Sequence, residues 1–185
     1  MKTPYYFGFG SLVNEQTLPV DTRWHKATLS GWRRSWRHPI AGEPSWAAMD
    51  VIADANSSID GLLVTGGTDI DEYLIKREAG YNPHELSHLH LCVDGELHAQ
   101  ASPCLWTSKH SQQNNEPLWL MQSYVDVVMS GYLRHFGEAG LERFVMTTDN
   151  WHLPVYDDRL APRYPRSVQL SDHEVQIITA LQPKP

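Results

Sequence analysis

The stretch Tyr5-Tyr6-Phe7-Gly8-Phe9-Gly10-Ser11-Leu12 decides how we expect the rest of the chain to fold. Its four aromatic residues favour the half-buried positions of a β-strand. Gly10 then permits a sharp turn or a close approach of the backbone to a ligand. Successive N–H groups at such a turn suit a carboxylate or phosphate, and Ser11 can cap the element that follows. The same residues also fit a buried first strand that ends in a glycine turn, so both interpretations stay open.

Length, composition and charge narrow the class of protein. Of the 185 residues, 41% are hydrophobic and 20% are charged, so we expect one globular domain over residues 1–185. The net charge of −7 and the lack of a basic run argue against general binding to nucleic acid or anionic membranes. We find neither a signal-peptide pattern nor an apolar stretch of about 18 residues. With only two cysteines, Cys92 and Cys104, the expected location is a reducing cytoplasm.

Hydrophobic patterning predicts strands in the first half of the chain and helices in the second. The predicted strands cover 24–36, 47–53, 59–64 and 97–106, with a loop at 38–44 and turns at 56–58 and 93–96. A helix is predicted over 71–79, and a longer one that opens at 114–117 and ends at Gly137, before a short helical piece over 138–144. The segment 151–166 should be extended over the surface, and a last helix should cover 171–181.

Ten histidines raise the possibility of a metal site. His84 and His88 have helical i, i+4 spacing, and Glu85 or His90 could add ligands. The sequence contains no HExxH motif and the cysteines lack CxxC spacing, so we predict no metal and keep a histidine-metal hydrolase only as a rival function. No GxSxG elbow or phosphate-binding glycine loop is present either.

Glu78 is the carboxylate that stands out. It follows the apolar stripe of the helix predicted over 71–79, and a negative charge at a helix C-terminus opposes the helix dipole. Partial burial would raise its pKa towards that of a useful proton shuttle. The alternative is a structural glutamate paired with Arg77, and the residue pattern alone leaves that alternative open.

Several short motifs together resemble the gamma-glutamylcyclotransferase-like superfamily. The stretch Phe7–Leu12 resembles its FGYGSL or YGSN loop, and the stretch 74–81, LIKREAGY, is similar to the helix that delivers its catalytic glutamate. Two strand motifs lie between them in the right order, Gly31-Trp32-Arg33-Arg34 and Asp60-Gly61-Leu62-Leu63. Tyr124, seven residues before Gly131, resembles a later substrate-contacting tyrosine.

The resemblance implies an α+β fold, a mixed and partly closed β-barrel of about five to seven strands with peripheral helices. It implies a cofactor-free reaction in which a gamma-glutamyl group cyclises to 5-oxoproline and releases an amine or amino acid. Glu78 would be the general acid and base and Tyr124 would contact the substrate. The remaining substrate-binding residues would come from the loop: Phe9, Gly10, Ser11, Leu12, Val13 and Asn14. The expected partner is a small gamma-glutamyl compound, and the protein would be a monomer or homodimer.

Phe9 departs from the family pattern, which has a tyrosine at that place. A hydrogen bond from that hydroxyl is therefore missing, which matters only if the hydroxyl touches substrate. The leaving group stays open between an amino acid, the Cys-Gly part of glutathione and an amine. A non-catalytic module that binds a small ligand on the same barrel is the main rival to the enzyme hypothesis.

Overall fold

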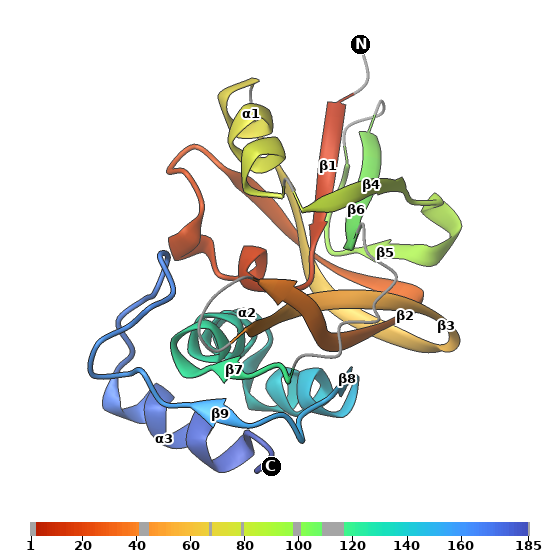
Figure 1. The fold of residues 1–185 in the computed structure, drawn as a ribbon. Helices are drawn as coiled ribbons and strands as arrows, with labels where there is room; N and C mark the ends of the chain where they lie inside the picture. The colour runs from red at the N-terminus through yellow and green to blue at the C-terminus, as the bar shows by residue number, and fades with distance from the viewer. Residues whose placement is uncertain are drawn as a thin grey trace.

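The computed structural model describes residues 3–40, 45–66, 68–78, 80–97, 101–108 and 117–184. Within them, seven strands form a mixed sheet in the order β4-β6-β1-β3-β2-β5, with β8 added beside β2 (Figure 1). The strands of this sheet are β1 Thr3–Gly8, β2 Arg23–Ile40, β3 Trp46–Thr65, β4 Tyr81–Glu85, β5 Leu91–Val93, β6 Ala101–Ser108 and β8 Thr148–Asp149. A second, two-stranded sheet pairs β7 Leu120–Met121 with β9 Val155–Tyr156.

Three α-helices accompany the sheets in the described residues: α1 Thr68–Arg77, α2 Gln122–Met146 and α3 Asp172–Leu181. Short 3-10 turns lie at η1 Ser11–Val13, η2 Glu15–Thr17 and η3 His88–His90. Figure 1 shows α2 below the β2–β3 ribbon, with α3 and β9 on the side of α2 away from the sheet. The expected α+β architecture with a mixed, partly closed sheet is confirmed. No helix in the described ranges is both long and apolar enough to cross a membrane.

The aromatic N-terminal stretch forms β1 at the centre of the sheet. It pairs antiparallel with β3 and parallel with β6. Phe7 is completely buried, as are Leu62 and Leu63 on the neighbouring β3. Gly61 is required where β3 pairs with the end of β1, because a Cβ there would lie 2.4 Å from the carbonyl oxygen of Gly8. The fold thus depends on the stretch that opens the sequence.

Strands β2 and β3 are longer than the strands that the sequence predicted, and they pair antiparallel with each other. The turn predicted at 56–58 is wrong as a break between two strands, because β3 runs through these residues. They lie at an irregularity in the pairing with β2, since Ala53 pairs with Trp32 and Ser58 with Ser30, so residues 54–57 stand opposite Gly31 alone. A register shift between Ser30 and Trp32, with Gly31 at a φ of +86°, lets the two strands bend without breaking. The loop predicted at 38–44 is also wrong as far as Ile40, which ends β2, while residues 41–44 lie outside the described part.

The hairpin predicted around 93–96 is wrong for a different reason. β5, which precedes the turn, pairs with β2, whereas β6 pairs with β1 and β4. The backbone N–H of Asp94 donates to the carbonyl of Lys26 on β2. The chain therefore remains beside β2 after β5 ends. Alternating apolar residues indicate a strand but not its neighbour, so the pattern found β6 and missed its partner.

The predicted helices are present in the structure, but their first and last residues differ from the prediction. α1 agrees with the helix predicted over 71–79, and α3 begins with a capping box between Ser171 and Glu174. The long helix begins at Gln122 rather than at 114–117, because Leu120 and Met121 join β9 in a strand. Gly137, at a φ of +69°, separates the long helix from the predicted short helical piece. Residues 114–116 lie outside the described part.

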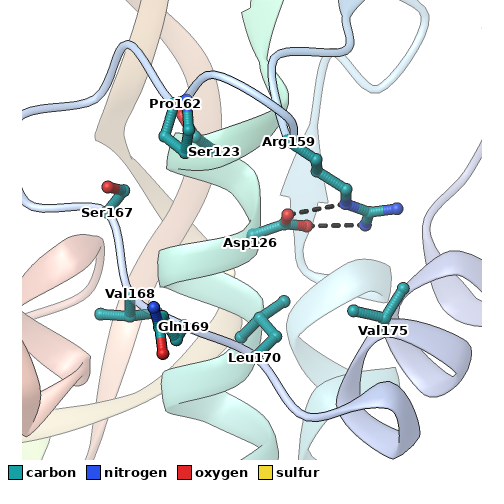
Figure 2. A pocket seen from close by; sticks show the side chains of 9 residues that line it. All are labelled: Ser123, Asp126, Arg159, Pro162, Ser167, Val168, Gln169, Leu170 and Val175. Atoms are coloured by element: carbon teal, nitrogen blue, oxygen red, sulfur yellow. Dashed lines mark hydrogen bonds and ion pairs between the residues drawn. The ribbon is translucent and has the colours of Figure 1, made fainter.

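The C-terminal segment is fastened to α2 rather than only lying over the surface. Asp158 is buried and accepts hydrogen bonds from the backbone N–H and the hydroxyl of Ser123, at 2.7 and 2.6 Å. Arg159 forms a two-point ion pair with Asp126, both contacts at 2.8 Å (Figure 2). These anchors hold the residues that follow them, up to Arg166, in a fixed path beside the loop after β1.

Candidate active site

The loop after β1 turns back on itself and rests on α2. The N–H groups of Val13 and Asn14 donate to the carbonyls of Gly10 and Ser11, and both side chains are completely buried. Asn14 also donates to the carbonyl of Val127 and the hydroxyl of Ser130 on α2, both at 3.0 Å. Val13 and Asn14 therefore support the loop from below, and among the residues Phe9 to Leu12 just before them Ser11 is the partly exposed one.

Two glycines allow the loop, the helix and a tyrosine to meet. A Cβ on Gly131 would lie 2.9 Å from the backbone of both Val13 and Asn14. A Cβ on Gly10 would lie 3.2 Å from the hydroxyl of Tyr124. Because seven residues make about two helical turns, Tyr124 and Gly131 lie on the same side of α2. The spacing noted in the sequence thus has a packing cause.

Tyr124 is nine-tenths buried, and its hydroxyl reaches the centre of the site. Its oxygen accepts a hydrogen bond of 3.3 Å from the backbone N–H of Met49. Burial raises the pKa of Tyr124 far above its ordinary value, so the hydroxyl keeps its hydrogen at neutral pH. That hydrogen is available to a ligand, because the bond to Met49 uses only the oxygen.

Glu78 directly follows the last residue of α1, and its N–H donates to Leu74 at 2.9 Å. Its side chain is 16% exposed, and its carboxylate lies 3.6 Å from the Nε of Arg77. Burial raises the pKa of the Glu78 carboxyl above its ordinary value, while the charges of Arg77 and Arg166 act in the opposite direction. The group therefore combines burial with access to solvent, which suits an acid–base residue.

Arg77 is engaged mainly with the loop and only secondarily with Glu78. One terminal nitrogen donates to the Thr17 carbonyl and the Tyr73 hydroxyl, and the other to the hydroxyls of Ser11 and Thr17, at 2.9 to 3.3 Å. The four hydrogens of its terminal nitrogens are thus placed, and the side chain is 2% exposed. The contact to Glu78 is longer than a hydrogen bond, which leaves the carboxylate oxygens accessible to a ligand.

Two adjoining cavities meet at Glu78. Both are lined by Ser11, Glu78, Tyr81 and Tyr124. The narrow inner cavity is completed by Phe7, Gly8, Phe9, Gly10, Leu12, Met49 and Trp106. The outer cavity, of about 200 Å³, is completed by His38, Ile40, Ala48, Arg77, Gly80, Tyr164 and Arg166. The structure thus brings Glu78 and Tyr124 together with four of the predicted loop residues, Phe9 to Leu12.

Four residues that bring polar groups to the outer cavity were missed by the sequence interpretation: His38, Tyr81, Tyr164 and Arg166. Tyr81 donates its hydroxyl to the Met49 carbonyl at 3.0 Å, and burial raises its pKa well above the ordinary value. The ring of His38 lies 4.3 Å from that of Tyr81. Tyr164 and Arg166 enter from the C-terminal segment. Only Tyr81 had a signal, as the last residue of the motif at 74–81.

A larger cavity, of about 420 Å³, lies between α2, the C-terminal segment and α3 (Figure 2). Its charged side chains are Asp126 and Arg159, which face each other in the ion pair that anchors the segment. Asp126 also accepts a hydrogen bond of 2.8 Å from Gln122. Because both carboxylate oxygens are occupied, this cavity offers no acid–base residue and is not the candidate site.

Of the three histidines in the 84–90 stretch, the structure describes the side chains of His84 and His90. His84 lies on β4, exposed, with its ring 5.3 Å from that of Trp32, and His90 is exposed at the end of η3. Among the described residues, no three His, Cys, Asp or Glu side chains are grouped as metal ligands would be. The side chain of His88 lies outside that part of the structure.

Comparison with solved structures identifies the fold. A human protein described as uncharacterized protein loc79017 matches with a TM-score of 0.58 at 10% identity, over 97% of this chain and 99% of that one. A gamma-glutamyl cyclotransferase matches with a TM-score of 0.57 at 12% identity, over 95% and 98%. YkqA from Bacillus subtilis matches with a TM-score of 0.54 at 19% identity, over 77% of this chain and 53% of its own. By sequence, the chain matches no family model and no curated protein.

These matches span nearly the whole of the chain in two of the three cases. The chain has the gamma-glutamylcyclotransferase-like fold. The resemblance carried by the short motifs of the first 81 residues is therefore confirmed at the level of the fold.

Proposed function

We propose that the protein is a gamma-glutamyl cyclotransferase that needs no cofactor. The observation that carries the proposal is the position of Glu78, a largely buried carboxyl with a raised pKa at the junction of two cavities. The loop after β1 and the Tyr124 hydroxyl face the same space. The fold, which a gamma-glutamyl cyclotransferase shares, supports the same reaction class.

The reaction would proceed within a single substrate molecule. The α-amine nitrogen attacks the γ-carbonyl carbon, which closes a five-membered ring and gives a tetrahedral intermediate. Glu78, as carboxylate, takes a proton from the attacking nitrogen and returns it to the leaving nitrogen when the old C–N bond breaks. The products are 5-oxoproline and a free amine, and no proton, electron or water is consumed.

Binding residues would supply the geometry that this cyclisation needs. At the start of η1, the N–H groups of Gly10, Ser11 and Leu12 precede the bonded turn and can hold substrate oxygens. The Tyr124 hydroxyl can donate its hydrogen to a further oxygen, because its own oxygen already accepts from Met49. Holding a flexible glutamyl arm with its amine close to the γ-carbonyl turns it into a near-attack conformer.

The test is release of 5-oxoproline from a panel of gamma-glutamyl amino acids, glutathione and gamma-glutamyl amines. The wild type is compared with Glu78→Gln and with Glu72→Gln, an exposed glutamate on α1, the helix that Glu78 follows. We expect Glu72→Gln to match the wild type and Glu78→Gln to lose about 10²- to 10⁴-fold, the usual contribution of a general acid–base. Binding without turnover by the wild type would instead favour the small-ligand binding module.

A further inference from the structure

Tyr164 and Arg166 connect the C-terminal segment to the loop after β1. The Tyr164 hydroxyl donates to the Ser11 hydroxyl oxygen at 2.9 Å, although the two residues are 153 positions apart in the sequence. The Nε of Arg166 donates to the Tyr164 hydroxyl oxygen at 3.2 Å, and its guanidinium lies 5.1 Å from the centre of that ring. Both residues line the outer cavity, but neither was expected there from the sequence.

The direction of these hydrogen bonds determines what Ser11 can do. The Tyr164 oxygen accepts from Arg166, and its single hydrogen goes to Ser11. The Ser11 oxygen also accepts from a terminal nitrogen of Arg77 at 2.9 Å. A hydroxyl has two lone pairs and one hydrogen, so both acceptor positions of Ser11 are occupied. Its hydrogen remains to be donated, and Ser11 lines both cavities.

We propose that Tyr164 and Arg166 are positioning residues that orient the Ser11 hydroxyl as a hydrogen-bond donor to an oxygen of the bound substrate. This inference rests on the proposed function, and it extends the site to a segment that follows the catalytic helix α1 by more than eighty residues. Without the Tyr164 donor, Arg77 alone would hold the Ser11 oxygen, and the hydroxyl could rotate and direct its hydrogen elsewhere.

The anchors on α2 make this arrangement rigid before substrate arrives. The backbone N–H of Tyr164 donates to the Ser123 hydroxyl at 3.1 Å, and that hydroxyl is bonded to Asp158. Arg159 is fixed on Asp126, as Figure 2 shows. The Tyr164 ring is nine-tenths buried, 4.8 Å from the ring of Tyr124. A donor held in this way loses little freedom when a ligand binds, which is the condition for effective positioning.

The first test compares Tyr164→Phe with Tyr156→Phe. Both substitutions remove one hydroxyl from the C-terminal segment and keep the ring, but the Tyr156 hydroxyl accepts from Arg163 and lines neither cavity. With the gamma-glutamyl compound that the wild type turns over fastest, kcat/KM should fall about three- to tenfold for Tyr164→Phe, the value of one hydrogen bond. It should stay unchanged for Tyr156→Phe.

A double-mutant cycle with Ser11→Ala separates positioning from a merely structural role. If Tyr164 acts through the Ser11 hydroxyl, then Tyr164→Phe has no further effect on kcat/KM once that hydroxyl is gone. If Tyr164 only supports the fold, its effect is the same with Ser11 or Ala at position 11. Thermal unfolding of each variant shows that the proteins compared are folded.

Arg166→Met, with Arg163→Met as its control, adds a readout in pH. Arg77 and Arg166 are the charged groups that lower the pKa of Glu78, and the titratable ring of His38 lines the same outer cavity. The hydroxyls of Tyr81 and Tyr124 stay neutral because burial raises their pKa values. Removing the Arg166 charge raises the pKa of Glu78 further, so the acid limb of the kcat/KM profile should move to higher pH. Arg163→Met should leave the profile in place.

The outcomes distinguish the two proposals. If the wild type is active and Tyr164→Phe has the same kcat/KM as Tyr156→Phe, the positioning role is overturned and the cyclotransferase function stands. The same holds if the effects of Tyr164→Phe and Ser11→Ala on kcat/KM are additive. Absence of 5-oxoproline release by the folded wild type would overturn the function and the positioning role together.

Discussion

Substitution of Gly131 by Ala tests the contact on which the site is built. In an ordinary helix this change stabilises by about 1 kcal/mol, because Ala has the higher helix propensity. Here the new Cβ would lie 2.9 Å from the backbone of Val13 and Asn14 and 3.0 Å from the Val13 carbonyl oxygen. Val13 and Asn14 are completely buried, and Asn14 is hydrogen-bonded to α2, so these atoms cannot move aside independently.

We expect Gly131→Ala to destabilise the protein, whereas the same change in an ordinary helix stabilises it. Overpacking against backbone costs about 1–3 kcal/mol, and subtracting the propensity gain of about 1 kcal/mol leaves a net loss of up to about 2 kcal/mol. Urea unfolding followed by circular dichroism measures it, with Glu142→Ala at an exposed position of α2 as the control. Stabilisation of Gly131→Ala by about 1 kcal/mol would refute the close approach of α2 to the loop, and with it the placement of Tyr124.

Three further predictions address the carboxylate, the anchor and the tyrosine. The pKa of Glu78 is raised in the folded state, so ionisation of its carboxyl lowers the free energy of unfolding as pH rises. Glu78→Gln should therefore be more stable than the wild type at pH 7. Urea titrations should show that this difference in the free energy of unfolding shrinks towards pH 4. A constant difference across that range would contradict the assigned burial. Arg159→Met leaves the buried Asp126 without its charged partner and should lower the free energy of unfolding by about 1–2 kcal/mol, whereas Arg23→Met, at an exposed position, should change it little. Tyr124→Phe should lower kcat/KM about tenfold while the protein stays folded, and wild-type kinetics in that variant would remove Tyr124 from the site.

The sequence located the parts of the site that short motifs describe. β1 and its glycine loop, α1 with Glu78, and Tyr124 on α2 were predicted, and the structure brings them together. These residues could be predicted because each lies near the end of a helix or strand that has a clear sequence pattern. The close contacts at Gly10, Gly61 and Gly131 require glycine, and those glycines can be recognised in the sequence. Element patterns and required glycines can both be recognised from a single sequence.

The remaining part of the site could not be predicted because its contacts are long-range and irregular. Tyr164 and Arg166 lie in a segment without secondary structure, where no periodicity indicates which side chain turns inward. Asp158 and Arg159 determine that path through bonds to α2, and charge pairing of this kind has no sequence signature. Strand partners were missed likewise: an apolar pattern predicted β6, but its pairing with β4 instead of β5 depends on the whole sheet.

The most direct test of the central claim is whether wild-type protein converts a gamma-glutamyl compound to 5-oxoproline and free amine in equal amounts. Chromatography with mass detection of both products measures it, with Glu78→Gln and Glu72→Gln treated in parallel. We expect equimolar products from the wild type and Glu72→Gln, and a loss of at least about a hundredfold in Glu78→Gln. Equal turnover by Glu78→Gln and the wild type would contradict the role of Glu78, and no turnover of any compound would contradict the cyclotransferase function itself.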